Sequence, residues 1–288
     1  MWKSDMTHKA FDVIVCGSLH LDIMVTSPHL PRRDETAVGS AWGMKCGGKG
    51  GNQAVMAARM GASTAMIGRV GKDDFGRRLL DHLAAARVDI SGVSVDEVAG
   101  SGMSVAIVEA TGEYGAVIVS GSNLVIDPAS IVGQWADLGG ARILTLQNEI
   151  PEAVNLAAAR VAKSAGAHIV LNAAPARVMA RELLDLVDLL VINRVEAEML
   201  SGVLVTDAES ATRAMSVLGG GRRDVVITLG GEGLVVQARD GEPVVIAPHR
   251  VTVVSTHGAG DCFLGMLCAE LARGKSLMDA CGAANIAA

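Results

Sequence analysis

Two short segments place glycines next to side chains that can exchange protons or bind polar groups. The segment GGKGGNQA spans residues 47–54, and the segment STHGAGD spans residues 255–261. Each precedes a stretch with helical character, where glycine allows close backbone approach and the first helical N–H groups favour anions. Asp261 could take a proton from an attacking hydroxyl, and the backbone before it could stabilise developing phosphate charge. Each segment alone leaves a simpler interpretation open: a glycine turn without a ligand, or an Asp that only caps its helix.

Polar residues also stand where two expected strands end. The segment NRVE covers residues 193–196, and TLGGEG covers residues 228–233. In open α/β sheets, ligands bind at the carboxyl ends of the strands. Glu196 could organise magnesium through waters, although a Glu in a first helical turn also simply complements the helix dipole. The second segment could face a nucleotide or form an ordinary hairpin.

The elements that must position these residues alternate along the chain. Short apolar runs predict strands, and amphipathic stretches between them predict helices, which together indicate a mostly parallel sheet covered on both faces. The expected strands are residues 11–16, 65–70, 142–147, 168–172, 189–193 and 224–229. The expected helices are residues 52–60, 75–87, 151–165, 196–200, 208–218, 262–273 and 277–288.

Two early stretches break this alternation. Residues 103–109 and 114–120 flank the turn-like segment 110–113 and predict a β-hairpin, and residues 28–44 lack a helical period. We expect segments near 28–44 and 101–120 to form a small β-flap on a single domain that spans residues 1–288. An ordinary surface hairpin is the alternative.

Composition excludes several classes of protein. The chain has 288 residues, of which 50% are hydrophobic and 19% charged, so it can bury a substantial core. Its net charge of −6 and lack of basic runs argue against a nucleic-acid partner. The five cysteines include no CxxC pair, which favours free thiols in a reducing cytoplasm over a disulfide or zinc framework. No run of about 18 apolar residues exists, so no membrane span is expected.

Together, the four polar segments resemble the ribokinase, or PfkB carbohydrate kinase, family. The likeness extends to residues 17–22 (GSLHLD), 147–149 (QNE) and 171–176 (LNAAPA). The resemblance implies a ribokinase-like three-layer α/β/α fold with a mostly parallel central sheet and a small β-sheet lid. It implies an enzyme that uses ATP and Mg²⁺ to phosphorylate a primary hydroxyl of a ribose-like sugar. A homodimer formed through the lid is a further implication.

The resemblance also implies a role for each matching residue. It makes Asp261 the general base and the backbone of Gly258, Ala259 and Gly260 the anion hole. The implied sugar-binding residues are His20, Asp22, Gly48, Lys49, Asn52 and Glu149. The implied nucleotide-binding residues are Asn193, Thr228, Gly230 and Gly233, and Glu196 would serve magnesium.

Two alternatives stay open at this point. The first is a kinase of the same fold that acts on a nucleoside or another sugar. The scarcity of aromatic residues, 2% of the chain, favours a free sugar over a nucleoside, whose base would be expected to stack on aromatic rings. The second is a non-catalytic protein that binds a sugar or a nucleotide on this fold.

Three departures from the family pattern bear on these expectations. His20 stands where ribokinases commonly carry Asn, which leaves the identity of the sugar open. Ser255 stands where many members carry an Asp that helps hold a monovalent cation, so activation by K⁺ is expected to be weak. The sequence stops at Ala288 within an expected helix, whereas relatives continue, so the C-terminal end of the domain is expected to be incomplete.

Overall fold

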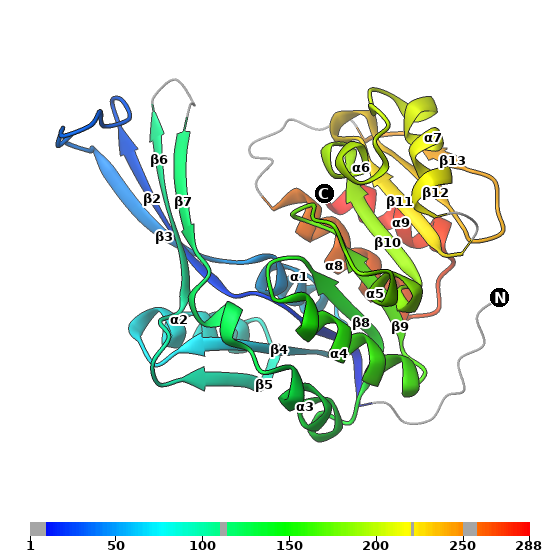
Figure 1. Cartoon of the computed structure of the whole chain (residues 1–288), viewed down its shortest axis with the longest axis horizontal. Coiled ribbons are helices and arrows are strands. Elements are labelled where there is room, and N and C mark those ends of the chain that lie inside the picture. The colour runs from blue at the N-terminus through cyan, green and yellow to red at the C-terminus, as the bar shows by residue number, and fades with distance from the viewer. Residues whose placement is uncertain (1–9, 110–113, 220–221, 250–257) are drawn as a thin grey trace.

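A large, mostly parallel sheet forms the middle layer of the molecule (Figure 1). A computed structural model of the chain describes residues 10–109, 114–219, 222–249 and 258–288. The strand order is β13-β12-β11-β10-β9-β8-β1-β4-β5, and every neighbouring pair from β11 to β5 is parallel. The strands are β1 (Phe11–Cys16), β4 (Thr64–Gly71), β5 (Asp89–Asp96), β8 (Ala141–Gln147), β9 (His168–Asn172), β10 (Leu189–Asn193), β11 (Asp224–Thr228), β12 (Leu234–Gln237) and β13 (Val244–Ile246).

Helices cover both faces of this sheet and complete the three layers. One face carries α1 (Lys49–Arg59), α2 (Asp74–Ala85), α8 (Ala259–Ala272) and α9 (Leu277–Ala287). The other face carries α3 (Ile131–Asp137), α4 (Glu152–Ser164), α5 (Arg181–Leu186), α6 (Arg194–Ser201) and α7 (Ala208–Leu218). Three short 3₁₀ turns, η1 (Gly121–Val125), η2 (Pro128–Ser130) and η3 (Gly230–Glu232), join elements of the described chain.

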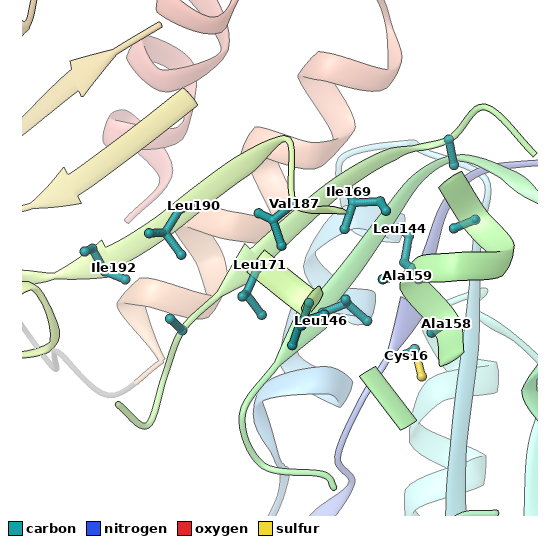
Figure 2. Packing of buried hydrophobic residues seen from close by; sticks show 14 of the residues in the cluster. Cys16, Leu144, Leu146, Ala158, Ala159, Ile169, Leu171, Val187, Leu190 and Ile192 are labelled. Atoms are coloured by element: carbon teal, nitrogen blue, oxygen red, sulfur yellow. The ribbon is translucent and has the colours of Figure 1, made fainter. Parts of the chain in front are cut away.

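The apolar strands contribute side chains to the cores on both faces of the sheet, because successive side chains point to opposite faces. In β1, Val13 and Val15 pack into the core beneath α1 and α8, whereas Ile14 and Cys16 pack into the core beneath α4. Figure 2 shows part of the second core, where Leu144, Leu146, Ile169 and Leu171 line up on neighbouring strands, with Ala158 and Ala159 of α4 beside them. The expected three-layer α/β fold is therefore confirmed.

A second, four-stranded sheet, here called the small sheet, extends away from this body (Figure 1). Its order is β3-β2-β6-β7, with β2 (His20–Ser27), β3 (Ala41–Gly47), β6 (Gly102–Glu109) and β7 (Tyr114–Val119). The expected hairpin corresponds to β6 and β7, while its turn, residues 110–113, lies outside the described residues. The expected segment 28–44 is different: residues 28–40 contain no strand, and the pairing partner of β3 lies earlier, in β2. This strand was not expected from the sequence, because His20 and Asp22 were interpreted as part of a polar motif.

Every strand and helix expected in the body appears within a few residues of its predicted bounds. The elements that were not expected are β2, β5, β12, β13, α3 and α5, while β3 begins inside the expected flap segment 28–44 and continues to Gly47. Several of these are short or half exposed, which leaves them without a continuous apolar run. Within the described ranges, no helix is long and apolar enough to cross a membrane.

Candidate active site

The polar residues singled out from the sequence meet at one edge of the main sheet. Parallel strands end there together, and Gln147, Asn193 and Thr228 are the last residues of β8, β10 and β11. Asn193 lies directly opposite Thr228 in the strand register. The first turns of α1, α6 and α8 carry several of the other expected residues toward this edge, whereas His20 and Asp22 lie on β2 of the small sheet. This edge is where an open α/β sheet binds ligands.

Asp261 does not cap its helix. The N-cap of α8 is Gly258, with φ of 83°, and the helix start has no side-chain cap bond. Asp261 is instead a buried residue, 7% exposed, and its carboxylate accepts two hydrogen bonds from α1. Asn52 Nδ2 donates to Oδ2 at 2.9 Å, and Gln53 Nε2 donates to Oδ1 at 2.9 Å. The simpler capping interpretation is therefore wrong.

The surroundings of Asp261 make it a stronger base than an ordinary Asp. Burial is the largest influence and raises its pKa, and the negative charge of Glu149 acts in the same direction. The positive charge of Lys49 and the hydrogen bonds from Asn52 and Gln53 lower the pKa and only partly offset burial. A base whose pKa is raised toward the working pH is better suited to general base catalysis.

Three backbone N–H groups at the start of α8 have no acceptor among the described residues. They belong to Gly258, Ala259 and Gly260, which begin the helix just before Asp261. The positive φ explains the glycine at 258, but no described atom lies within 4 Å of a Cβ built on Gly260. These donors are suited to bind an anion beside the buried carboxylate.

The glycines of the loop before α1 are required by close packing of two backbone segments. Gly48 has φ of 82°, and a Cβ there would lie 2.8 Å from His20 N and 2.9 Å from Ser18 O. A Cβ on Gly50 would lie 2.7 Å from Ser18 N, and Gly51 N donates to Ser18 O at 3.0 Å. This packing brings the first turn of α1 next to Asp261.

Glu149 joins the loop to the end of β8. Its Oε2 accepts hydrogen bonds from Ser18 Oγ at 2.5 Å and from the backbone N of Lys49 at 2.9 Å. His20 Nδ1 lies 3.8 Å from the same oxygen. The His20 ring is buried, its Nε2 has no partner among the described residues, and it fills the space that a side chain at Gly102 would need. His20 is therefore a buried polar group whose Nδ1 lies just beyond hydrogen-bond distance of Glu149 Oε2.

Asp22 lies on the small sheet, two residues from His20 on the same face of β2. Its Oδ1 accepts from Ser104 Oγ at 2.5 Å, and Oδ2 lies where a side chain at Gly47 would be. Lys45 and Ser104 are its register partners on β3 and β6. The small sheet thus holds the carboxylate of Asp22, which was expected to bind the sugar.

Glu196 and Asn193 form a capping box at the start of α6. Asn193 Oδ1 accepts from Glu196 N at 2.9 Å, and Glu196 Oε2 accepts from Asn193 N at 2.9 Å. Glu196 is 9% exposed, and its burial raises its pKa, while the charge of Lys49 lowers it. The charge of Asp261 raises it further, so the two carboxyl groups are close enough to influence each other.

The site offers oxygen ligands for magnesium rather than a closed metal cage. No group of three or more His, Cys, Asp or Glu within the described ranges could hold a metal ion alone. Glu196 uses Oε2 in its capping box, and Oε1 pairs with no described group. Mg²⁺ is commonly bound through one or two carboxylates, waters and substrate phosphates, so this donor set fits it.

The turn after β11 is tied to the start of α6. Arg194 Nη2 donates to Leu229 O at 2.9 Å and to Glu232 Oε1 at 2.9 Å. Gly230 has φ of 62°, and Gly233 has φ of 87° with a Cβ position that overlaps Ile246 O. The backbone geometry alone therefore accounts for both glycines.

Several residues that complete this site have no role that the motifs alone predict. Gln53, Gln147 and Ser18 are all buried and bond to Asp261, Gln53 and Glu149 respectively. Gln53 lies in the GGKGGNQA segment, so its position beside Asn52 was the available signal. Ser255, the basis of the expectation about K⁺, lies outside the described residues.

Comparisons with known proteins agree with this geometry. The family model described as "pfkB family carbohydrate kinase" matches residues 10–288. Ribokinase of Haemophilus influenzae is 35% identical over 267 residues, covering 92% of this chain and 87% of that protein. Deoxyribokinase of Salmonella typhi is 31% identical over 256 residues, covering 88% and 83%. Arabidopsis thaliana ribokinase complexed with ribose and ATP has a TM-score of 0.87 at 27% identity, over 96% of this chain and 91% of that one.

The family match spans nearly the whole chain, and the fold agrees from the nine-stranded sheet to the small sheet. The resemblance found in the sequence is thereby confirmed. This chain belongs to the pfkB family of carbohydrate kinases, and it is a phosphotransferase that acts on a sugar hydroxyl.

Proposed function

We propose that this chain transfers the γ-phosphoryl group of ATP to a primary hydroxyl of ribose or a closely similar sugar. The observation that carries this proposal is the buried Asp261 carboxylate directly beside the N–H groups that begin α8, which have no acceptor among the described residues. A base next to an anion-binding helix start is the arrangement that phosphoryl transfer to an alcohol needs. The ribokinase relatives, including one solved with ribose and ATP, support the choice of sugar and of phosphoryl donor.

The sugar would lie between the start of α1 and the small sheet. Asp22, Asn52, Glu149 and the Lys49 side chain supply directional acceptors and donors around this space, and the backbone of Gly48 begins the helix there. Hydrogen bonds to carboxylates are strong, and a polar site left unpaired rejects an analogue that lacks the matching hydroxyl. His20 Nδ1 lies 3.8 Å from Glu149 Oε2, and Nε2 has no partner among the described residues, which makes His20 the residue that would tune the choice of sugar.

The sugar hydroxyl then loses its proton to Asp261 and receives the phosphoryl group from ATP. The sugar hydroxyl gives its proton to the carboxylate of Asp261 while its oxygen forms the new bond to the γ-phosphorus. The bond from that phosphorus to the bridging oxygen breaks, and ADP leaves with the electron pair. The N–H groups of Gly258, Ala259 and Gly260 would stabilise the negative charge that spreads over the transferred group.

The donor side would be built from α6 and the turn after β11. Asn193, Thr228, Gly230 and Gly233 lie together at this end of the sheet, where a nucleotide can approach the backbone. Glu196 Oε1 would orient magnesium through water. When bound, the ion neutralises phosphate charge in the transition state.

A sugar panel tests this proposal. ADP release from Mg-ATP is measured with D-ribose, 2-deoxyribose, fructose, adenosine, pseudouridine and no acceptor, in Na⁺, K⁺ or a bulky organic cation at constant ionic strength. We expect the highest kcat/KM with ribose and no large K⁺-specific gain, because Ser255 carries no charge. Turnover only with a nucleoside would contradict the proposal. Binding of ribose without any ADP release would instead favour the non-catalytic alternative.

The His20→Asn variant tests whether His20 selects the sugar. If His20 selects the acceptor, the ratio of kcat/KM between ribose and 2-deoxyribose changes while the KM for ATP stays the same. An unchanged ratio would leave His20 as a packing residue over Gly102.

We further propose a homodimer formed through the small sheet. Its residues alternate, so the face opposite Asp22 carries Trp42 and Val117, which are 70% and 68% exposed. Such an exposed apolar face is suited to bury itself against a second copy. A Trp42→Glu, Val117→Glu double variant should sediment as a monomer, whereas Ile118→Glu, on the other face, should not change the mass in solution.

The cysteines support a location in the cytoplasm. All five cysteine positions are described and all are free, and burial raises the pKa of the Cys16 and Cys268 thiols to about 12. Such thiols suit a reducing compartment.

A further inference from the structure

We infer that Gln53 and Gln147 are positioning residues that hold the Asp261 carboxylate in one orientation. They form a buried chain of amides that ends on this carboxylate. Gln147 Nε2 donates to Gln53 Oε1 at 2.8 Å, and Gln53 Nε2 donates to Asp261 Oδ1 at 2.9 Å. Both glutamines are 0% exposed. The inference rests on the proposed role of Asp261 as the base.

The hydrogen bonds between the two glutamines and Asp261 can run in only one direction, because the carboxylate at the end is charged. An ionised carboxylate only accepts hydrogen bonds, so Gln53 must turn its NH₂ toward Asp261 and its oxygen toward Gln147. Gln147 must then present its own NH₂ to that oxygen. A proton on Oδ1 of Asp261 would face the NH₂ of Gln53 and break the chain. The two amides therefore favour the ionised carboxylate, the form that a general base needs.

The protein makes room for this chain at two glycines. The Gln147 carboxamide occupies the position where a Cβ on Gly17 would be. A Cβ on Gly265 of α8 would lie 2.6 Å from Met56 Cβ and 2.8 Å from the backbone oxygen of Gln53. The backbones of α1 and α8 thus approach closely one turn beyond Asp261. This approach lets a glutamine on one helix reach a carboxylate on the other.

The two oxygens of Asp261 consequently have different surroundings. Oδ1 is bonded to the fully buried Gln53, whereas Oδ2 is bonded to Asn52, which is partly exposed. Each carboxylate oxygen can accept more than one hydrogen bond. Oδ2 is therefore the atom available to take the proton of the sugar hydroxyl.

Other charged groups around Asp261 set the background against which the glutamines act. Lys49 on α1 favours ionisation, and Glu149 after β8 opposes it. Glu196 on α6 interacts with Asp261 electrostatically, and Cys262 is its neighbour on α8. None of these groups bonds directly to Oδ1, so the glutamine chain can be varied without removing a charge.

The test measures kcat/KM for ribose against pH, together with the melting temperature, in five proteins. These are the wild type, Gln53→Glu, Gln53→Met, the double variant Gln53→Met, Gln147→Met, and the control Gln134→Met. Gln134 is a partly buried glutamine on α3 whose Nε2 donates to Gly92 O at 3.3 Å, away from the site. Asp261→Asn is assayed beside them.

Distinct results are expected for each variant. In Gln53→Glu, a second carboxylate beside Oδ1 should move the acidic limb of the profile up by about one pH unit or more. In Gln53→Met, the limb moves up less, and misplacement of the base lowers kcat by about 10- to 100-fold. The double variant should regain melting temperature relative to Gln53→Met, because it leaves no unpaired Gln147 amide, but it should keep the altered limb. The control should keep the wild-type limb and kcat.

The outcomes separate this inference from the proposed function. If Asp261→Asn abolishes turnover but the glutamine variants keep the wild-type limb and kcat, Gln53 and Gln147 serve only folding, and the inference is wrong. If Asp261→Asn retains near-wild-type turnover, the proposed base is itself wrong. If Gln53→Met fails to fold, the double variant and Gln53→Glu still decide the result.

Discussion

The two sides of the active site are built in different ways. On the acceptor side, the hydrogen bonds join residues that are far apart in sequence: Lys49 and Glu149 are separated by 100 positions, and Asn52 and Asp261 by 209. On the donor side, the capping box joins Asn193 to Glu196, only 3 positions later. The acceptor side exists only once α1, α8 and β8 have packed together. The donor side is largely a local structure placed at the end of a strand.

This difference predicts how many hydrogen bonds a single substitution disturbs on each side. A substitution on the acceptor side should disturb several bonds at once, because the buried groups share partners. A substitution in the capping box should remain confined to the start of α6, because the contacts of this helix with the turn after β11 are made by Arg194 and not by the box. Three variants, taken from the largest expected effect to the smallest, test this comparison.

The largest effect is expected for Asp261→Asn. Removal of the base should lower kcat about 10²- to 10⁴-fold, because proton transfer in the transition state is lost. The amide oxygen can still accept from Gln53, and the partly exposed Asn52 can flip so that its Oδ1 accepts from the new NH₂, so the melting temperature should fall by only a few degrees. Steady-state kinetics and calorimetry measure both. Near-wild-type turnover would show that the carboxylate is not the base.

A smaller effect is expected for Gly265→Ala. The added methyl group would press against Met56 and the Gln53 backbone and should cost about 1–3 kcal/mol in the free energy of unfolding. Because the same shift moves α1 against α8, kcat should fall as well. Gly282→Ala on α9 is the matched control, since no described atom lies within 4 Å of its Cβ position. Equal kcat in the two variants would mean that the approach of α1 to α8 does not position the base.

The smallest effect is expected for Asn193→Ala on the donor side. Loss of the cap should cost about 1 kcal/mol in the free energy of unfolding. The KM for ATP should rise, whereas the KM for the sugar should stay unchanged, because the acceptor-side bonds of Lys49 and Asn52 go to Glu149 and Asp261 and not to α6. Titration of each substrate separately measures this. A parallel change in both KM values would contradict the separation of the two sides.

Much of the fold was predictable because the main sheet is buried on both faces. Its central strands, such as β9 and β10, are continuous apolar runs, and they appear at their expected bounds. The half-exposed strand β5 and the short strand β13 have no such signal. Strand β2 was missed because it contains His20 and Asp22, which the expected chemistry had already claimed.

The polar segments were equally visible in the sequence, but their interactions were not. The order of the motifs indicated a base, a helix start and a glutamate in a first helical turn, all properties of residues close together in the chain. By itself, therefore, the sequence determined the family, the alternation of elements and the local turns, since these depend on neighbouring residues.

Only the tertiary structure decided what Asp261 bonds to. A motif cannot distinguish an Asp that caps its own helix from one held by another helix, because both are favoured at a helix start. The partners Gln53 and Gln147 reach it through contacts across 208 and 94 positions, and through glycines that let backbones approach. Asp261 and the two glutamines become buried only when the helices pack onto the sheet. This burial raises the pKa of Asp261, since desolvation depends on the packed molecule and not on any one segment.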